Sequence, residues 1–111
     1  MGAALEAVRA YGDFHGLSGE DAERLRPGSP FTKIVFRDGV LSVDYEGCYI
    51  VVEPFLDEVV RLMPPEGWGK LDCIDQIEWR LTRYTVRGNA WTARTVSGDQ
   101  AVERTRDTAG V

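Results

Sequence analysis

One stretch of the chain constrains the fold more than any other: residues 32–45, "TKIVFRDGVLSVDY". Apolar and polar residues alternate on both sides of Asp38-Gly39, a pattern that predicts a β-hairpin with a two-residue type I′ turn. An apolar face and a charge pair then emerge from the same register, which indicates an antiparallel sheet with one buried face. The expected cross-strand pairs are Phe36 with Leu41, Ile34 with Val43, Thr32 with Tyr45 and, on the other face, Lys33 with Asp44.

A second tight turn at Glu46-Gly47 would bring residues 48–52, "CYIVV", back along the same sheet. In that register Ile50 lies opposite Val43 and Val52 opposite Leu41, so the apolar face continues into a third strand. The sequence therefore predicts a three-strand meander.

Three helices are expected around this meander. Residues 3–15, "AALEAVRAYGDFH", place apolar side chains three positions apart, which is typical of an amphipathic helix. A short helix should follow Ser18 as its N-cap and stop before Pro27. A third should cover residues 53–63, with Pro54 in its first turn.

The residues 83–94, "RYTVRGNAWTAR", predict another hairpin around Gly88-Asn89. One face then carries Tyr84, Val86 and Trp91 and belongs on the core. Like charges directly opposite each other destabilise a sheet, so the other face raises the question of what its arginines hold. The expected pairs are Arg87 with Ala90, Val86 with Trp91, Thr85 with Thr92, Tyr84 with Ala93 and Arg83 with Arg94.

These elements predict an α+β fold, in which an antiparallel sheet, made of a three-strand meander plus a two-strand hairpin, has helices packed on one face. In topology alone, the order helix, short helix, three strands, helix, two strands resembles small secretion chaperones, and the resemblance implies a binding module. No linker or repeat divides the chain. We expect a single domain over residues 1–98 and a polar tail, frayed or disordered, over residues 99–111.

Charge narrows the class of partner. The chain has 18 acidic and 13 basic residues and a net charge of −5, which disfavours nucleic acid and anionic membrane surfaces. Residues 80–94 are the exception, because they contain four arginines and no acidic residue. Without a signal-peptide pattern or a bilayer-spanning apolar run, the chain is expected to be cytoplasmic.

Few residues suggest catalysis. Cys48 and Cys73 are too far apart for a CxxC motif and are expected to be free thiols, and with one histidine they cannot build a structural zinc site. His15 is expected at a helix end, as a capping or surface residue. We predict no metal, no cofactor and no catalytic residues, although an acid/base pair among the carboxylates Asp44, Glu53, Asp72 and Asp75 stays open.

The arginine-bearing face of the second hairpin is the candidate site. Guanidinium groups interleaved with hydroxyls suit the recognition of carboxylates or phosphates. The alternative is that these arginines extend into water or pair with acids of the same chain, such as Asp72, Asp75 and Glu78. The candidate residues for binding a partner or an anion are Arg83, Arg94, Arg87, Thr85, Thr92, Trp68 and Trp79.

The tryptophans leave two questions open. Trp68 lies in a glycine-flanked loop and would serve either as a binding anchor or as a lid on the core. By strand alternation, Ile77, Trp79 and Leu81 fall on the arginine face. Either a bulge near Thr82 switches the faces, or the base of the strand exposes an apolar patch, and the second option favours a homodimer.

Two functions remain. The first is a small acidic protein-interaction module, an adaptor, chaperone or immunity-like protein without catalytic activity, which contacts an acidic partner through its arginine-rich hairpin. The alternative is a small-molecule-binding or enzymatic α+β domain that holds an anionic ligand with the same arginines.

Overall fold

A computed structural model describes residues 7–97 of the chain. Six strands and two helices follow one another along these residues: β1 (Val8–His15), α1 (Gly19–Leu25), β2 (Lys33–Arg37), β3 (Val40–Gly47), α2 (Glu53–Leu62), β4 (Trp68–Asp75), β5 (Arg80–Arg87) and β6 (Ala90–Ser97). The fold is therefore α+β and consists mostly of sheet.

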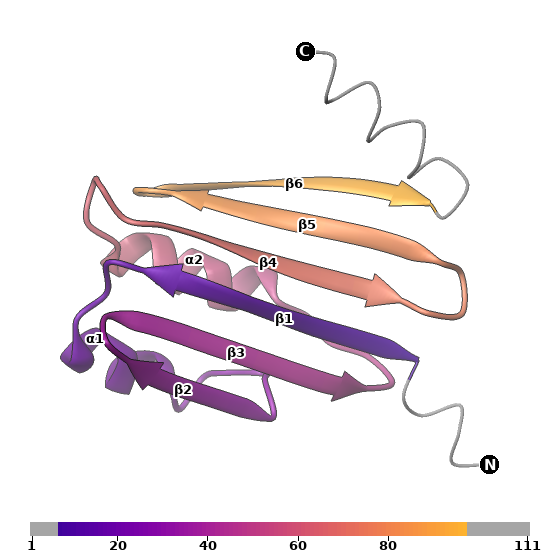
Figure 1. The fold of residues 1–111 in the computed structure, drawn as a ribbon, viewed down its shortest axis with the longest axis horizontal. Coiled ribbons are helices and arrows are strands. Elements are labelled where there is room, and N and C mark those ends of the chain that lie inside the picture. The colour runs from indigo at the N-terminus through magenta and orange to yellow at the C-terminus, as the bar shows by residue number, and fades with distance from the viewer. Residues whose placement is uncertain (1–6, 98–111) are drawn as a thin grey trace.

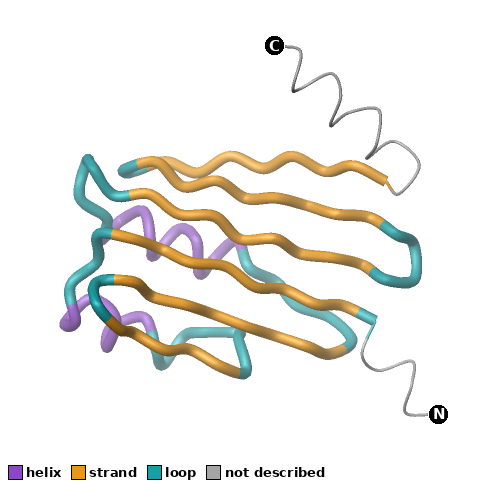
Figure 2. Tube along the Cα trace, in the orientation of Figure 1, coloured by secondary structure: helices purple, strands orange, loops and turns teal. Residues whose placement is uncertain are grey.

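All six strands belong to one antiparallel sheet with the order β2-β3-β1-β4-β5-β6. Figure 1 shows both helices behind the sheet in that view, and Figure 2 shows the strands running side by side between loops at two ends. β1 lies in the middle and pairs with β3 on one side and β4 on the other. β1 thus joins the two halves of the sheet.

The hairpin predicted for residues 32–45 is confirmed. β2 and β3 pair in the expected register, with Phe36 opposite Leu41 and Ile34 opposite Val43. Asp38 and Gly39 have φ values of 55° and 80°, as a type I′ turn requires at both central residues. Of the expected pairs, only Thr32 with Tyr45 falls outside the ladder, because β2 begins at Lys33.

The helix predicted over residues 3–15 is wrong where the structure describes it, because Val8–His15 form a strand. The same residues alternate with a period of two: Ala10 and Phe14 are buried while Arg9 and Asp13 are exposed. Gly12 permits a close approach of β4 to this strand. A Cβ at that position would lie 2.2 Å from the backbone oxygen of Lys70, so only glycine allows β4 to pair here.

The third strand of the predicted meander is also wrong, because residues 48–52 form a loop and β3 pairs with β1 instead. Pairing with β1 joins all eight residues of β3 to a partner, whereas residues 48–52 offer only five. Val52 is still buried, but as the N-cap of α2. The longer ladder satisfies more backbone groups, which is the physical reason for the outcome.

Both remaining helices form near their predicted bounds. Ser18 caps α1: its hydroxyl accepts from the backbone N–H of Asp21, and the Asp21 carboxylate accepts from the N–H of Ser18. α2 carries Pro54 in its first turn and ends at Leu62, one residue before the predicted end.

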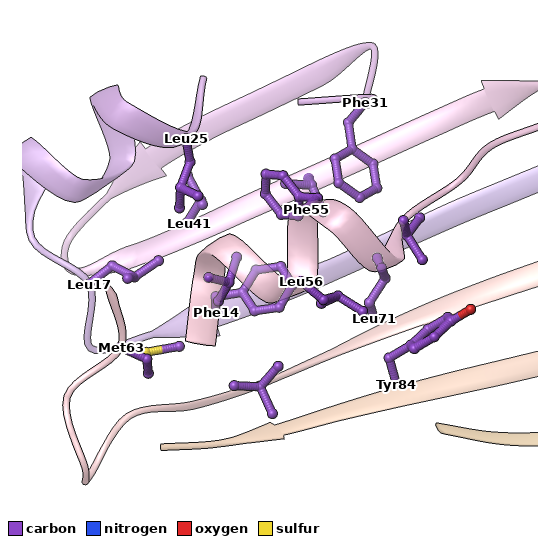
Figure 3. Packing of buried hydrophobic residues seen from close by; sticks show 14 of the residues in the cluster. Phe14, Leu17, Leu25, Phe31, Leu41, Phe55, Leu56, Met63, Leu71 and Tyr84 are labelled. Carbon is purple, nitrogen blue, oxygen red and sulfur yellow. The ribbon is translucent and has the colours of Figure 1, made fainter. Parts of the chain in front are cut away.

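The core lies between the helices and the sheet. Phe55 of α2 makes edge-to-face contacts with Phe14 of β1 and with Phe31, at ring-centroid distances of 6.1 and 5.0 Å. Figure 3 shows these rings together with Leu41, Leu56 and Leu71, which are all fully buried. Side chains of α2 therefore pack against the sheet on both sides of β1 and help to hold its two halves together.

The hairpin at Gly88-Asn89 forms in the predicted register, including Arg83 opposite Arg94. Gly88 has a φ of 57° while Asn89 does not have a positive φ, as in a type II′ turn. Asn89 also donates to the backbone oxygens of Val60 and Met63, which ties the hairpin tip to the end of α2.

β4, which was not predicted from the sequence, joins this hairpin to the rest of the sheet. The described order β-α-β-β-α-β-β-β also differs from the one on which the likeness to secretion chaperones rested. The tail predicted over residues 99–111 lies outside the described residues.

Candidate functional site

The candidate residues lie mainly on the face of the sheet that points away from the helices, which we call the open face. Among residues 7–97, no helix or strand covers it, and Tyr11, Val35 and Trp68 are exposed there. Its charged members follow from the strand registers: Arg9, Asp13, Lys33, Arg37, Asp44, Glu46, Lys70, Asp72, Arg83, Arg87 and Arg94.

Charge divides the open face into two halves. On β1, β2 and β3, three basic side chains are balanced by three acidic ones: Arg9, Lys33 and Arg37 against Asp13, Asp44 and Glu46. On β4, β5 and β6, which we call the basic half, Lys70, Arg83, Arg87 and Arg94 accompany a single acid, Asp72. A chain with a net charge of −5 thus concentrates positive charge on three neighbouring strands.

Asp72 is the partner of Arg83. The two residues lie opposite each other on β4 and β5, and the guanidinium donates two parallel hydrogen bonds to the carboxylate, with Nε–Oδ1 and Nη2–Oδ2 distances of 2.7 and 2.9 Å. The Asp72 side chain is only 9% exposed, whereas that of Arg83 is 48% exposed. The hydrogen bond to Asp72 raises the pKa of Arg83 further above its ordinary value.

The ion pair with Asp72 shows what Arg83 holds on the open face. Asp72 neutralises Arg83 from within the chain, as one of the two alternatives expected, and so relieves part of the repulsion with Arg94 across the turn. Arg83 therefore anchors the basic half, and its outer edge stays half-exposed for a further contact. Of the other two acids considered, Asp75 accepts from the backbone N–H groups of Ile77 and Glu78, and Glu78 pairs with Arg80.

A shallow depression of about 280 Å³ lies in the basic half, and its lining contains no acidic residue. Trp68 forms one wall and stacks on His15 of β1, with ring centroids 4.0 Å apart and planes 6° from parallel. The lining residues are Trp68, Gly69, Lys70, Arg83, Thr85, Val86 and Arg87, of which Val86 has its side chain buried in the core. The depression combines cationic donors, a hydroxyl and a flat aromatic surface, which together suit a carboxylate-bearing ligand.

Most of the predicted binding residues come together on the basic half. Trp68, Arg83, Thr85 and Arg87 line the depression, and Thr92 and Arg94 lie beside them on β6. Trp68 points away from the core and is 52% exposed, so it forms no lid over the core. His15 lies at the end of a strand and not of a helix.

Lys70 was not among the residues predicted from the sequence, whereas Asp72 was one of three acids expected as possible partners of the arginines. The alternation in "WGKLDCID", with Leu71 and Cys73 on one face and Lys70 and Asp72 on the other, was the available signal for this strand.

Trp79 lies apart from the other candidates, in the turn that joins β4 and β5. Trp79 and Ile77 are 65% and 68% exposed, and Trp79 has a φ of 51°, which bulky residues rarely adopt. The strand ladder runs without a bulge from Arg80 to Arg87. Leu81 lies on the open face between Ile74 and Val96, so the base of the sheet carries an apolar row beside the exposed turn.

A second depression of about 280 Å³ lies on the other half of the open face. Its charges are mostly satisfied within the sheet, since Arg9 lies 3.6 Å from Asp44 and Ser42 donates to Asp13. Lys33 lies opposite Asp44 as predicted, but the ion pair seen at Asp44 is the one with Arg9. This half offers mixed charge and is the weaker candidate for binding an anion.

The two cysteines are free thiols in different surroundings, which predicts different reactivity. Cys48 is exposed, while burial, with Glu53 and Asp72 nearby, raises the pKa of the Cys73 thiol from 9.0 to about 12. Because the thiolate is the reactive form, a disulfide reagent at pH 8 should modify Cys48 at least about tenfold faster than Cys73. Cys48→Ser and Cys73→Ser variants assign the two phases, and equal rates would contradict the placement of Cys73.

The same shift gives a pH dependence. The pKa of Cys73 is higher in the folded than in the unfolded state, so folding is favoured by keeping this thiol protonated. That contribution to the free energy of unfolding is fully present below pH 9.0 and is lost as the pH rises towards about 12.

Within residues 7–97 no helix is long and apolar enough to cross a membrane. In the same residues, no three His, Cys, Asp or Glu side chains cluster closely enough to hold a metal ion. Comparison of the chain with protein-family models, with curated proteins and with solved structures gave no match.

Proposed function

We propose that the protein is a protein-interaction module that binds an acidic segment of another protein on the basic half of its open face. The observation that carries the proposal is the contrast between a net charge of −5 and three adjacent strands whose open face carries four basic side chains and one acidic one. Complementary charge of this kind steers association and selects partners.

The arrangement assigns a role to each side chain. Asp72 holds Arg83 in place through two hydrogen bonds, so this guanidinium is preorganised for a further contact at its exposed edge. Lys70 and Arg87 flank it along the depression, and within residues 7–97 no ion pair neutralises either side chain. Trp68 offers a flat anchor of the type that contributes most to interface energies.

The depression supports a protein partner over a small-molecule ligand. At about 280 Å³, and open to solvent, it falls short of the enclosed pockets of roughly 300 to 1,000 Å³ that bury small molecules. A small anion held by Lys70, Arg83 and Arg87 is the second candidate, and it is favoured by the absence of acidic residues in the lining.

The test compares charge removal on the two sides of the molecule. A fluorescent oligoglutamate peptide is titrated with the wild type, with a Lys70→Ser/Arg87→Ser variant and with an Arg24→Ser/Arg61→Ser variant, whose substitutions lie on the helices. Both variants lose two positive charges. Fluorescence anisotropy should show at least tenfold weaker binding for the first and less than twofold for the second, relative to the wild type.

Equal losses in both variants would mean that only net charge matters and would contradict the proposal. Competition by millimolar inorganic phosphate that abolishes peptide binding would favour the small-anion candidate. Tighter binding of a single-stranded oligonucleotide than of oligoglutamate would assign the face to nucleic acid.

We also propose that the exposed turn of Ile77 and Trp79 mediates self-association into a homodimer. A tryptophan in the left-handed region costs about 1 to 2 kcal/mol, and such strain at an exposed position points to a contact. Trp79→Gly should therefore raise the free energy of unfolding by about 1 kcal/mol and abolish the dimer in sedimentation at micromolar concentration. A wild type that sediments only as a monomer would refute this contact.

A further inference from the structure

The two edges of the sheet differ in how they are protected. β2 is five residues long, and Arg26, which follows α1, donates from Nη1 to the backbone oxygen of Ile34 at 3.1 Å. In a two-residue hairpin the closing pair is hydrogen-bonded, so Ile34 directs its backbone groups away from β3. An arginine side chain therefore occupies the edge of β2, a common way to block further strand pairing.

β6 forms the opposite edge and lacks this protection within the described residues. It is eight residues long and contains no proline. With Arg87 and Ala90 as the closing pair, the backbone groups of Ala93 and Thr95 point away from β5. In residues 7–97 no hydrogen bond uses those groups. Ala93 and Thr95 thus present backbone donors and acceptors in the geometry that an added strand requires.

We propose that the acidic partner binds as an extended segment that adds to β6 as a seventh strand. This inference rests on the proposed function and specifies the class of partner. An added strand would lie about 4.8 Å from β6, within reach of the basic half. Ala90 is small, so the side chain of Arg87 can extend over it towards the edge.

The two faces of the added strand would meet different surroundings, which predicts the pattern of the partner sequence. Towards the open face its side chains would lie beside Thr92 and Arg94, where acidic residues are favoured. Arg94 has a further interaction of its own and contributes its positive charge to this edge. Towards the helices they would lie beside Ala93 and the ring of Trp91. The partner segment should therefore alternate acidic residues with small or apolar ones.

The edge is held in a fixed position before the partner arrives. Trp91 donates from Nε1 to Asp57 of α2 at 2.9 Å, and Asn89 binds two backbone oxygens at the end of the same helix. Because β6 is fastened to α2 at these points, less conformational entropy is lost on binding.

A second copy of the chain fits this edge less well than an acidic segment. Symmetric antiparallel pairing of two β6 strands near their middle brings Arg94 of one copy directly opposite or diagonal to Arg94 of the other. It also places two basic halves side by side, and like charges opposite each other are destabilising.

The experiment uses a peptide of alternating Glu and Thr, as long as β6, and two variants at one position. Ala93→Pro removes an N–H that points away from β5, where an edge strand tolerates proline, while Ala93→Ser keeps the N–H. Ala93→Pro should bind the peptide at least tenfold more weakly than the wild type, and Ala93→Ser within twofold of it.

Amide hydrogen exchange gives a second readout that does not depend on the folding of the proline variant. The amides of Ala93 and Thr95 should exchange rapidly in the free protein and slowly with the peptide bound. Slow exchange in the free protein would show that the edge is already paired, by this chain or by a second copy, and would overturn the inference. Wild-type affinity of Ala93→Pro, alongside weak binding by Lys70→Ser/Arg87→Ser, would overturn the seventh strand and leave the proposed function standing.

Discussion

Gly12→Ala should destabilise the protein by about 3 kcal/mol or more, a large value for overpacking. The added Cβ would lie 2.2 Å from the backbone oxygen of Lys70 and 2.7 Å from the Cα of Leu71, so two backbones in the middle of the sheet would have to separate. Chemical denaturation followed by far-ultraviolet circular dichroism measures the effect.

The sign of this change separates two folds for residues 8–15. In a helix, replacing glycine by alanine would stabilise the protein by about 0.5 to 1 kcal/mol. Gly28→Ala is the matched control, because a Cβ at that position meets nothing within 4 Å. If Gly12→Ala were neutral or stabilising, β1 would not pair with β4 as described.

Arg83→Ser should lower the free energy of unfolding by about 2 kcal/mol. Breaking a buried ion pair costs about 3 to 5 kcal/mol, and the value is reduced here because the Arg83 side chain is 48% exposed. Most of the loss comes from the Asp72 carboxylate, which stays largely buried without its two hydrogen bonds. Thermal and chemical denaturation of the isolated protein measure it.

Arg87→Ser is the control for this prediction, since it removes the same charge from the same face, and its effect should stay within about 0.5 kcal/mol. A double-mutant cycle with Asp72→Asn isolates the coupling between the two side chains. A cycle with no coupling energy would show that Asp72 and Arg83 do not interact in solution. Two arginines directly opposite each other repel, but the bond to Asp72 makes Arg83 a stabilising residue.

The sequence predicted local structure where a turn specifies the register. Asp38-Gly39 and Gly88-Asn89 each fix the pairing of their flanking strands, and both ladders form as expected. The N-cap at Ser18 and the proline at the start of α2 are equally local signals.

Prediction failed where pairing joins distant segments. In residues 8–15, Val8, Tyr11 and Phe14 fit a spacing of three, while Ala10 and Phe14 fit the alternation that the structure follows. Only the presence of β4, which is far away in the chain, decides between these patterns.

The candidate site shows the same division. Its arginines and hydroxyls could be predicted from the sequence of one hairpin, because strand alternation places them on one face. Which of the three candidate acids pairs with Arg83 was not predictable, since Asp72 belongs to a strand whose pairing with β5 no tight turn specifies. The depression beside Trp68 likewise depends on three strands at once.

The most direct test of the account is a map of amide chemical-shift changes when the alternating Glu and Thr peptide is added at low salt. We expect saturable changes concentrated on β4, β5 and β6, with the largest on β6, and a loss of binding as salt screens the charges. Changes concentrated on α1, α2 or β2, or the absence of any saturable change, would contradict the claim that the basic half of the open face binds an acidic partner.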